Sequence, residues 1–173
     1  MVMLAPTLHT VDIRKILQEV NAVVQQELTA KRQASLKMLI VDDDPAEQQM
    51  LCNMLASYGE PDTAVTGKEA VNAFRSALKK GKPYNLICLD MLSETECFET
   101  LKHIRKIEME KGIHGLDGVK IMMTTASGGS QHNTDAFRSG CEGYLKKPVD
   151  EKKLINLLKT LNFDNKILKK MTT

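Results

Sequence analysis

Polar residues follow several apolar runs of this sequence, and their types are those of a site that binds ions. Three consecutive carboxylates, Asp42, Asp43 and Asp44, close one apolar run, and Asp90 closes another. Further along the chain, the polar residues that follow apolar runs are Thr124, Thr125, Lys146 and Lys147. Like charges side by side repel, so this concentration of carboxylates indicates a cationic partner.

A divalent metal and a phosphate are the ligands that these residue types fit. Carboxylate ligands without His or Cys favour Mg²⁺ or Mn²⁺ over zinc, and Mg²⁺ commonly shares its coordination sphere with phosphate oxygens. A lysine supplies a point charge to a phosphate, and a threonine supplies a hydroxyl donor. The residues therefore suit a combined metal and phosphate site if the fold brings them together.

The elements that must position them alternate between strand and helix. Apolar runs predict strands at about 37–42, 62–65, 84–90, 119–125 and 142–145. Segments of helical period predict helices at about 45–58, 68–80, 96–111, 131–139 and 150–161. This alternation predicts a doubly wound α/β domain with a five-stranded parallel sheet. Ligands of such folds bind beyond the carboxyl ends of the strands, where the polar residues lie.

Composition excludes several classes of protein. The chain has 173 residues and a net charge of +2, too small to indicate nucleic acid or an anionic membrane as the main partner. No segment approaches the roughly 18 apolar residues of a membrane span, and the N-terminus lacks the order of a signal peptide. We therefore expect a cytoplasmic protein. The four cysteines are far apart and are expected to be reduced and mostly buried.

The sequence predicts three regions. Residues 1–35 form a helical extension, residues 36–162 form the α/β domain, and residues 163–173 form a basic tail. Residues 9–34 contain no Gly or Pro and predict one long helix. Its apolar residues recur at spacings of four, three and four, as in a coiled coil; they are Ile13, Leu17, Val20 and Val24. This stripe is expected either to pair two chains into a homodimer, which we favour, or to pack on the chain's own domain.

Four motifs resemble the signature of the response-regulator receiver domains of two-component signalling. In chain order, they are Val41–Pro45, Leu89–Asp90, Thr125–Ala126 and Gly143–Pro148. The resemblance covers about residues 37–161. It implies a flavodoxin-like sheet of strand order 2-1-3-4-5, here with an extra N-terminal helix.

The resemblance also implies the metal ligands. Asp42 and Asp43 are similar to the acidic pair that holds Mg²⁺ (or Mn²⁺), and Asp90 and the backbone carbonyl of Leu92 would complete the protein ligands. No other cofactor is expected. Asp44, which precedes Pro45, is better placed to cap the following helix.

For the phosphoryl group, the resemblance makes Asp90 the acceptor. Lys147 would neutralise a phosphoryl oxygen, and its bond to Pro148 is a candidate cis peptide. Thr125 would hydrogen-bond the phosphoryl group, and Tyr144 would follow by changing rotamer as part of the switch.

These roles imply a single-domain response regulator. It would accept phosphoryl from a histidine kinase or phosphotransfer protein and signal by binding a downstream protein, with no enzymatic activity beyond the chemistry of Asp90 itself. The roughly dozen residues after the last predicted helix are too few for an output domain. A hydrolase of the haloacid-dehalogenase type is disfavoured, because it would need Asp-x-Asp after the first strand and a cap domain.

The segment after Asp90 departs from the family pattern. Receivers usually have Met-Pro and then Asp-Gly, whereas residues 91–99 lack both Pro and Gly and add Glu94 and Glu96. The departure keeps an alternative open, a degenerate receiver that docks or sequesters a partner without phosphorylation. The sequence does not identify the kinase or the target.

Overall fold

The chain divides into two compact units, Met1–Ala34 and Ser35–Thr173. The computed structural model describes residues 13–33, 35–90, 94–126 and 140–163. In the first unit, α1 (Ile13–Gln33) is one continuous helix, and residues 9–12 of the predicted helix lie outside the described residues. No helix in the described ranges is both long enough and apolar enough to cross a membrane.

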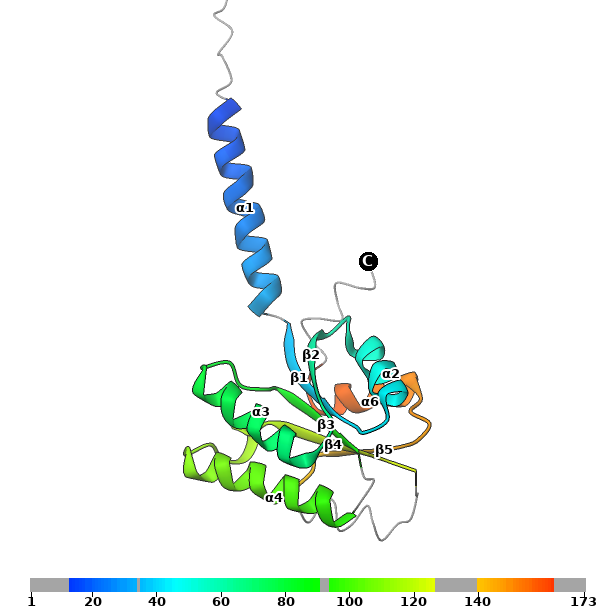
Figure 1. Cartoon of the computed structure of the whole chain (residues 1–173). Coiled ribbons are helices and arrows are strands. Elements are labelled where there is room, and N and C mark those ends of the chain that lie inside the picture. The colour runs from blue at the N-terminus through cyan, green and yellow to red at the C-terminus, as the bar shows by residue number, and fades with distance from the viewer. Residues whose placement is uncertain (1–12, 34, 91–93, 127–139, 164–173) are drawn as a thin grey trace, which may run out of the picture. The chain divides into compact units, whose positions relative to one another are not determined.

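The second unit is built on a five-stranded sheet in which all strand pairs are parallel (Figure 1). The strands are β1 (Leu36–Val41), β2 (Gly59–Ala64), β3 (Leu86–Asp90), β4 (Lys120–Thr125) and β5 (Gly143–Lys146). The other elements are α2 (Pro45–Leu55), α3 (Gly67–Lys79), α4 (Glu94–Glu110), the short helix η1 (Gly115–Asp117) and α6 (Glu151–Thr160). The strand order, β2-β1-β3-β4-β5, confirms the predicted doubly wound fold. The helix predicted at 131–139 lies outside the described residues.

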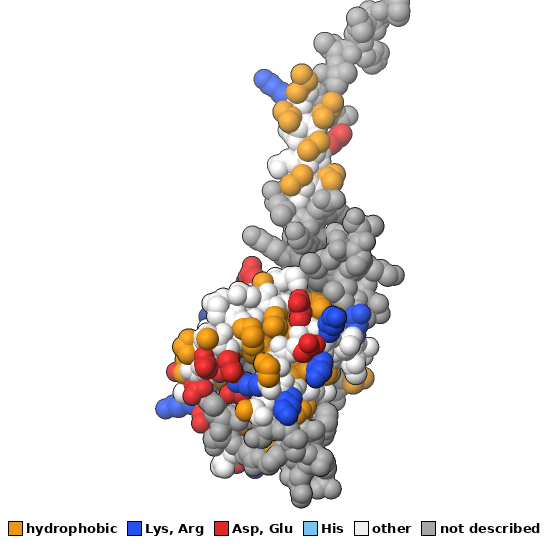
Figure 2. Space-filling model, turned by 90° about the vertical axis from the view of Figure 1, so that its right-hand side faces the viewer, with side chains coloured by type: hydrophobic (Ala, Val, Ile, Leu, Met, Phe, Trp, Pro, Cys, Tyr) orange, Lys and Arg blue, Asp and Glu red, His pale blue; other side chains and the backbone are white. Residues whose placement is uncertain are grey.

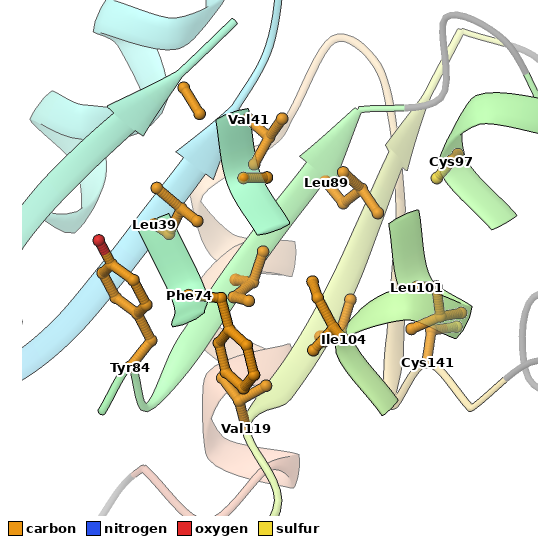
Figure 3. Close-up of a cluster of buried hydrophobic side chains, with 14 of the residues drawn as sticks. Leu39, Val41, Phe74, Tyr84, Leu89, Cys97, Leu101, Ile104, Val119 and Cys141 are labelled. Atoms are coloured by element: carbon orange, nitrogen blue, oxygen red, sulfur yellow. The ribbon is translucent and has the colours of Figure 1, made fainter. Parts of the chain in front are cut away.

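Each face of the sheet carries its own apolar cluster, because successive residues of a strand point to opposite faces. From β1, Leu39 and Val41 join a cluster with residues of α3 and α4, including Phe74 and Leu101 (Figure 3). The alternate residues, such as Ile40, join a second cluster with α2 and α6. The central strands are therefore buried on both faces, which explains their continuous apolar sequences.

Strand β2 lies at the edge of the sheet, and its sequence predicts a strand only weakly. It begins at Gly59, earlier than the predicted start at residue 62. Pro61 pairs with Met38 of β1, and the missing N–H of a proline is tolerated on an edge strand. The pairing with β1 therefore extends further than local propensity indicates.

Asp44 caps α2, as the sequence predicts. Its side chain accepts hydrogen bonds from the backbone N–H groups of Ala46, at 2.7 Å, and Glu47, at 3.3 Å, and Pro45 occupies the first turn. These bonds satisfy donors that have no partner within the helix. The carboxylate of Asp44 is thus used by the helix, which leaves Asp42 and Asp43 for the site described below.

Replacing Asp44 by Ala should lower the free energy of unfolding by about 1 kcal/mol, because the cap is lost. Chemical denaturation measures this change, with Glu110→Ala, at an exposed position at the end of α4, as the control expected to stay within about 0.5 kcal/mol of wild type. Equal stability of Asp44→Ala and wild type would contradict the capping role.

Candidate functional site

Three carboxylates meet at the carboxyl ends of β1 and β3. Asp42, Asp43 and Asp90 each offer an oxygen, and these oxygens lie within 4.8 Å of one another. Asp42 is buried, Asp43 is exposed, and the Asp90 side chain is only 4% exposed. They are adjacent because β1 and β3 are parallel neighbours that end together, as the sequence reasoning expected.

Asp42 is held from both sides of its carboxylate. Its Oδ1 accepts the backbone N–H of Asp44 at 2.9 Å, and its Oδ2 lies 3.0 Å from Nζ of Lys147. The Gln48 side chain donates to the backbone carbonyls of Asp42 and Ala64, which ties the start of α2 to the ends of β1 and β2. The turn between β1 and α2 thus fixes the buried carboxylate in place.

Lys147 supplies the positive charge at this edge. Its ammonium lies 3.0 Å from Asp42 and 2.9 Å from Oδ1 of Asp90, and it also contacts Oε2 of Glu47. Burial by itself would lower the pKa of Lys147, but hydrogen bonds with Glu47, Asp90 and Asp42 hold that pKa above its usual range. Lys147 is therefore charged. The peptide bond between Lys147 and Pro148 is cis, which confirms that prediction.

The two threonines of β4 lie on opposite faces of the sheet. Thr124 pairs with Asp90 across the strands, and its hydroxyl donates to Asp90 Oδ1 over 3.4 Å. Thr125 is buried, and its backbone carbonyl accepts the N–H of Lys147 at 2.7 Å. Strand alternation puts Thr125 on the same face as Tyr144, which packs against the cluster beneath α3 and α4. The predicted switch pair is thus on one face, while Asp90 and Thr124 share the other.

An open pocket borders this group of residues. It is lined by Asp42, Asp43, Asp44, Pro45, Glu47, Asp90, Ala126 and Lys147. Sequence reasoning missed Glu47 and gave no role to Thr124. Glu47 falls three residues after the capping Asp44, where a glutamate is expected for reasons of helix capping alone. Thr124 could have been found from strand register, because it is the residue of β4 opposite Asp90.

A second pocket borders the same carboxylates on the side of α3 and α4. Glu96 lines it, and its Oε1 accepts the backbone N–H of Gly67, at the start of α3, at 3.2 Å. The Glu96 carboxylate therefore binds the N-terminus of α3, where negative charge is favourable. Leu92, the predicted carbonyl ligand, lies outside the described residues, as does the rest of 91–93.

The donor set fits a divalent metal that prefers oxygen. Asp42, Asp43 and Asp90 supply carboxylates only, and the pocket beside them is open. Among the His, Cys, Asp and Glu side chains of the described ranges, these three lie close enough together to hold a metal ion as a group. All four cysteines are free, three are buried and Cys52 is half-buried, as predicted. The site therefore suits Mg²⁺ or Mn²⁺ beside an anionic group paired with Lys147.

Comparison with protein families gives a match over the same region. The family model described as the response regulator receiver domain matches residues 38–159. This range begins in β1, ends within α6 and includes every site residue named above.

Individual relatives agree with this match. The two-component response regulator 24 of Arabidopsis thaliana is 30% identical, over 81% of this chain and 94% of its own length. The transcriptional regulatory protein CpxR homolog of Haemophilus influenzae is 32% identical over 72% of this chain, which spans only 49% of that protein.

A solved structure is similar in fold and sequence. It is the co-crystal structure of the Saccharomyces cerevisiae histidine phosphotransfer signaling protein Ypd1 with the receiver domain of its downstream response regulator Ssk1. The match has a TM-score of 0.61 and 30% identity, and it covers 73% of this chain and 88% of the other.

Saturating Mg²⁺ should raise the melting temperature of the wild-type chain, because a ligand that binds only the folded state stabilises it by mass action. In Asp43→Ala, which removes the exposed carboxylate of the three, this increase should be lost or strongly reduced. Differential scanning fluorimetry with and without Mg²⁺ measures both. Equal increases in the two proteins would show that the ion binds elsewhere.

Proposed function

Because the chain belongs to the family of response regulator receiver domains, we propose that it accepts a phosphoryl group on Asp90 and signals in the phosphorylated state. The observation that carries the proposal is the convergence of Asp42, Asp43, Asp90 and Lys147 on one open pocket. Its chemistry is confined to its own Asp90, so we do not propose an enzyme with a separate substrate.

In the transfer, a carboxylate oxygen of Asp90 forms a bond to phosphorus while the bond from phosphorus to the donor breaks. Phosphoryl transfer depends mainly on positioning and on neutralising the charge of the phosphoryl oxygens. Lys147, 2.9 Å from Asp90, is placed to provide part of that charge. A bound Mg²⁺, held by Asp42, Asp43 and Asp90, would supply the remaining charge neutralisation.

The phosphoryl donor is proposed to be a histidine kinase or a histidine phosphotransfer protein. The similarity to a receiver crystallised with such a phosphotransfer protein supports this choice. The open pocket that Asp90 lines is the proposed route of approach for the donor. The output is proposed to be the binding of a downstream protein, in the cytoplasm as the sequence predicts.

The switch is proposed to act through Thr125 and Tyr144. A phosphoryl group adds negative charge at Asp90 and would draw the Thr125 hydroxyl and Lys147 toward it. Thr125 and Tyr144 lie on the same face of neighbouring strands, so a displacement of Thr125 alters the space beside the Tyr144 ring. The ring would then change rotamer and alter the surface that a partner contacts.

Incubation with acetyl phosphate and Mg²⁺ should add one phosphoryl group to the wild-type chain and none to Asp90→Asn, in which an uncharged amide replaces the nucleophilic carboxylate. Intact mass spectrometry measures the addition. An unmodified wild-type chain would favour the alternative, a degenerate receiver that docks without phosphorylation. Modification that persists in Asp90→Asn would place the acceptor at another residue.

We also propose that α1 pairs with α1 of a second copy of the chain. Six large apolar side chains of this helix are between 44% and 69% exposed; they are Ile13, Ile16, Leu17, Val20, Val23 and Val24. Figure 2 shows hydrophobic side chains along this helix. Four of the six have coiled-coil spacing, and a second copy offers the same stripe. Burial of each such side chain stabilises by roughly 1.5–3 kcal/mol at most, so pairing is favoured over exposure.

Leu17→Asp in the full chain should convert a dimer into a monomer, because it places a charge in the middle of the apolar stripe. Light scattering measures the mass. The matched control is Gln18→Asp, which adds the same charge on the opposite side of α1 and should leave the dimer intact. A wild-type monomer would instead favour packing of α1 on the chain's own receiver domain, and a dimer that survives Leu17→Asp would place the interface elsewhere.

A further inference from the structure

Glu47 is a carboxylate partner of Lys147 to which the proposed transfer to Asp90 assigns no role. It lies in the first turn of α2, and its Oε2, which contacts the Lys147 ammonium, is buried although the side chain as a whole is 38% exposed. The same carboxylate lines the open pocket beside Asp90. Glu47 therefore faces the space that a phosphoryl group would enter.

The Lys147 ammonium is shared among three carboxylates. An ammonium has three donors, and this one contacts the carboxylates of Asp42, Asp90 and Glu47. A phosphoryl group on Asp90 also needs this ammonium, because Lys147 is the cation that the structure places beside Asp90. Each donor that stays with Glu47 is unavailable to a phosphoryl oxygen.

The charges at the pocket make this competition significant. Apart from Asp44, whose carboxylate caps α2, the lining residues include four carboxylates and one lysine. One bound divalent ion and the lysine together would leave one negative charge uncompensated. A phosphoryl group brings further negative charge to the same place. Glu47 opposes that change in two ways, by repulsion and by retaining Lys147.

We propose that Glu47 is a positioning residue that restrains phosphoryl acceptance at Asp90 by competing for the ammonium of Lys147. This inference rests on the proposed function, because it concerns the rate of the same transfer. The same charge has a second effect, since Glu47 makes the pocket more attractive to a divalent cation. Removal of the Glu47 charge should therefore speed phosphoryl acceptance at Asp90 and weaken the binding of Mg²⁺.

The test compares Glu47→Gln with wild type in two measurements. With acetyl phosphate as donor at saturating Mg²⁺, the initial rate of phosphoryl acceptance should rise about three- to tenfold, because one competing charge is removed close to the reacting group. In the absence of donor, the affinity for Mg²⁺, measured by calorimetry, should fall by about three- to tenfold. A merely damaged site would lose both activities, so the opposite signs identify the positioning role.

Two further variants separate contact from general charge effects. Glu47→Asp keeps the charge and should lie closer to wild type than Glu47→Gln in both measurements. Glu151→Gln removes an exposed carboxylate from the first turn of another helix, α6, and should stay within about twofold of wild type. If Glu151→Gln reproduces the effects of Glu47→Gln, they come from the net charge and the inference is wrong.

The outcomes also distinguish this inference from the proposed function. A wild-type chain that accepts no phosphoryl group overturns both. A wild-type chain that accepts phosphoryl at the same rate as Glu47→Gln overturns only the role of Glu47. A rate that falls in Glu47→Gln would also overturn it, since Glu47 would then assist the transfer.

Discussion

The ion pair of Lys147 with Asp42 and Asp90 is the interaction on which the site depends. The Asp42 side chain is fully buried and that of Asp90 is only 4% exposed, and buried carboxylates are costly unless they are paired with positive charge. Without Lys147, the strand ends would hold several negative charges with no compensating cation in the described site. The position of Lys147 is in turn fixed by the backbone, since its N–H bonds to Thr125 at the end of β4. The ion pairs of Lys147 and the backbone bond between Lys147 and the end of β4 therefore stabilise one another.

Strand alternation separates Asp90 from the residues proposed to act in the switch. By strand alternation, Asp90 and Thr124 share the face that α2 and α6 cover, and Glu47 of α2 contacts Lys147. Thr125 and Tyr144 point to the opposite face. Lys147 has its ammonium at the carboxylates and its backbone bonded to Thr125, so one residue contacts both groups. Lys147 therefore connects the carboxylates to Thr125, for which a switch role is proposed.

Much of this arrangement could be predicted from the sequence, because the signals were local. Alternating apolar runs and helical segments predicted the parallel sheet, and strand ends predicted the meeting of Asp42, Asp43 and Asp90. Asp44 before Pro45 predicted a helix cap. The contact between Glu47 and Lys147 could not be predicted in this way, because it joins residues 100 positions apart and depends on side-chain direction at the start of α2. Thr124 was named among the polar residues at strand ends, but its bond to Asp90 was not predicted, since that bond follows from the register of β3 and β4 and not from its own neighbours in sequence. The roles of Thr125 and Tyr144 in a switch remain predictions from the family resemblance.

The most direct test of the central electrostatic claim is the affinity for Mg²⁺ of Lys147→Met compared with wild type. Lys147 and the metal are expected to neutralise the same carboxylates, so they compete, and removal of the ammonium should strengthen Mg²⁺ binding by about tenfold or more. Calorimetry at constant ionic strength measures this without any phosphoryl donor. Equal or weaker Mg²⁺ binding by a folded Lys147→Met chain would contradict the account.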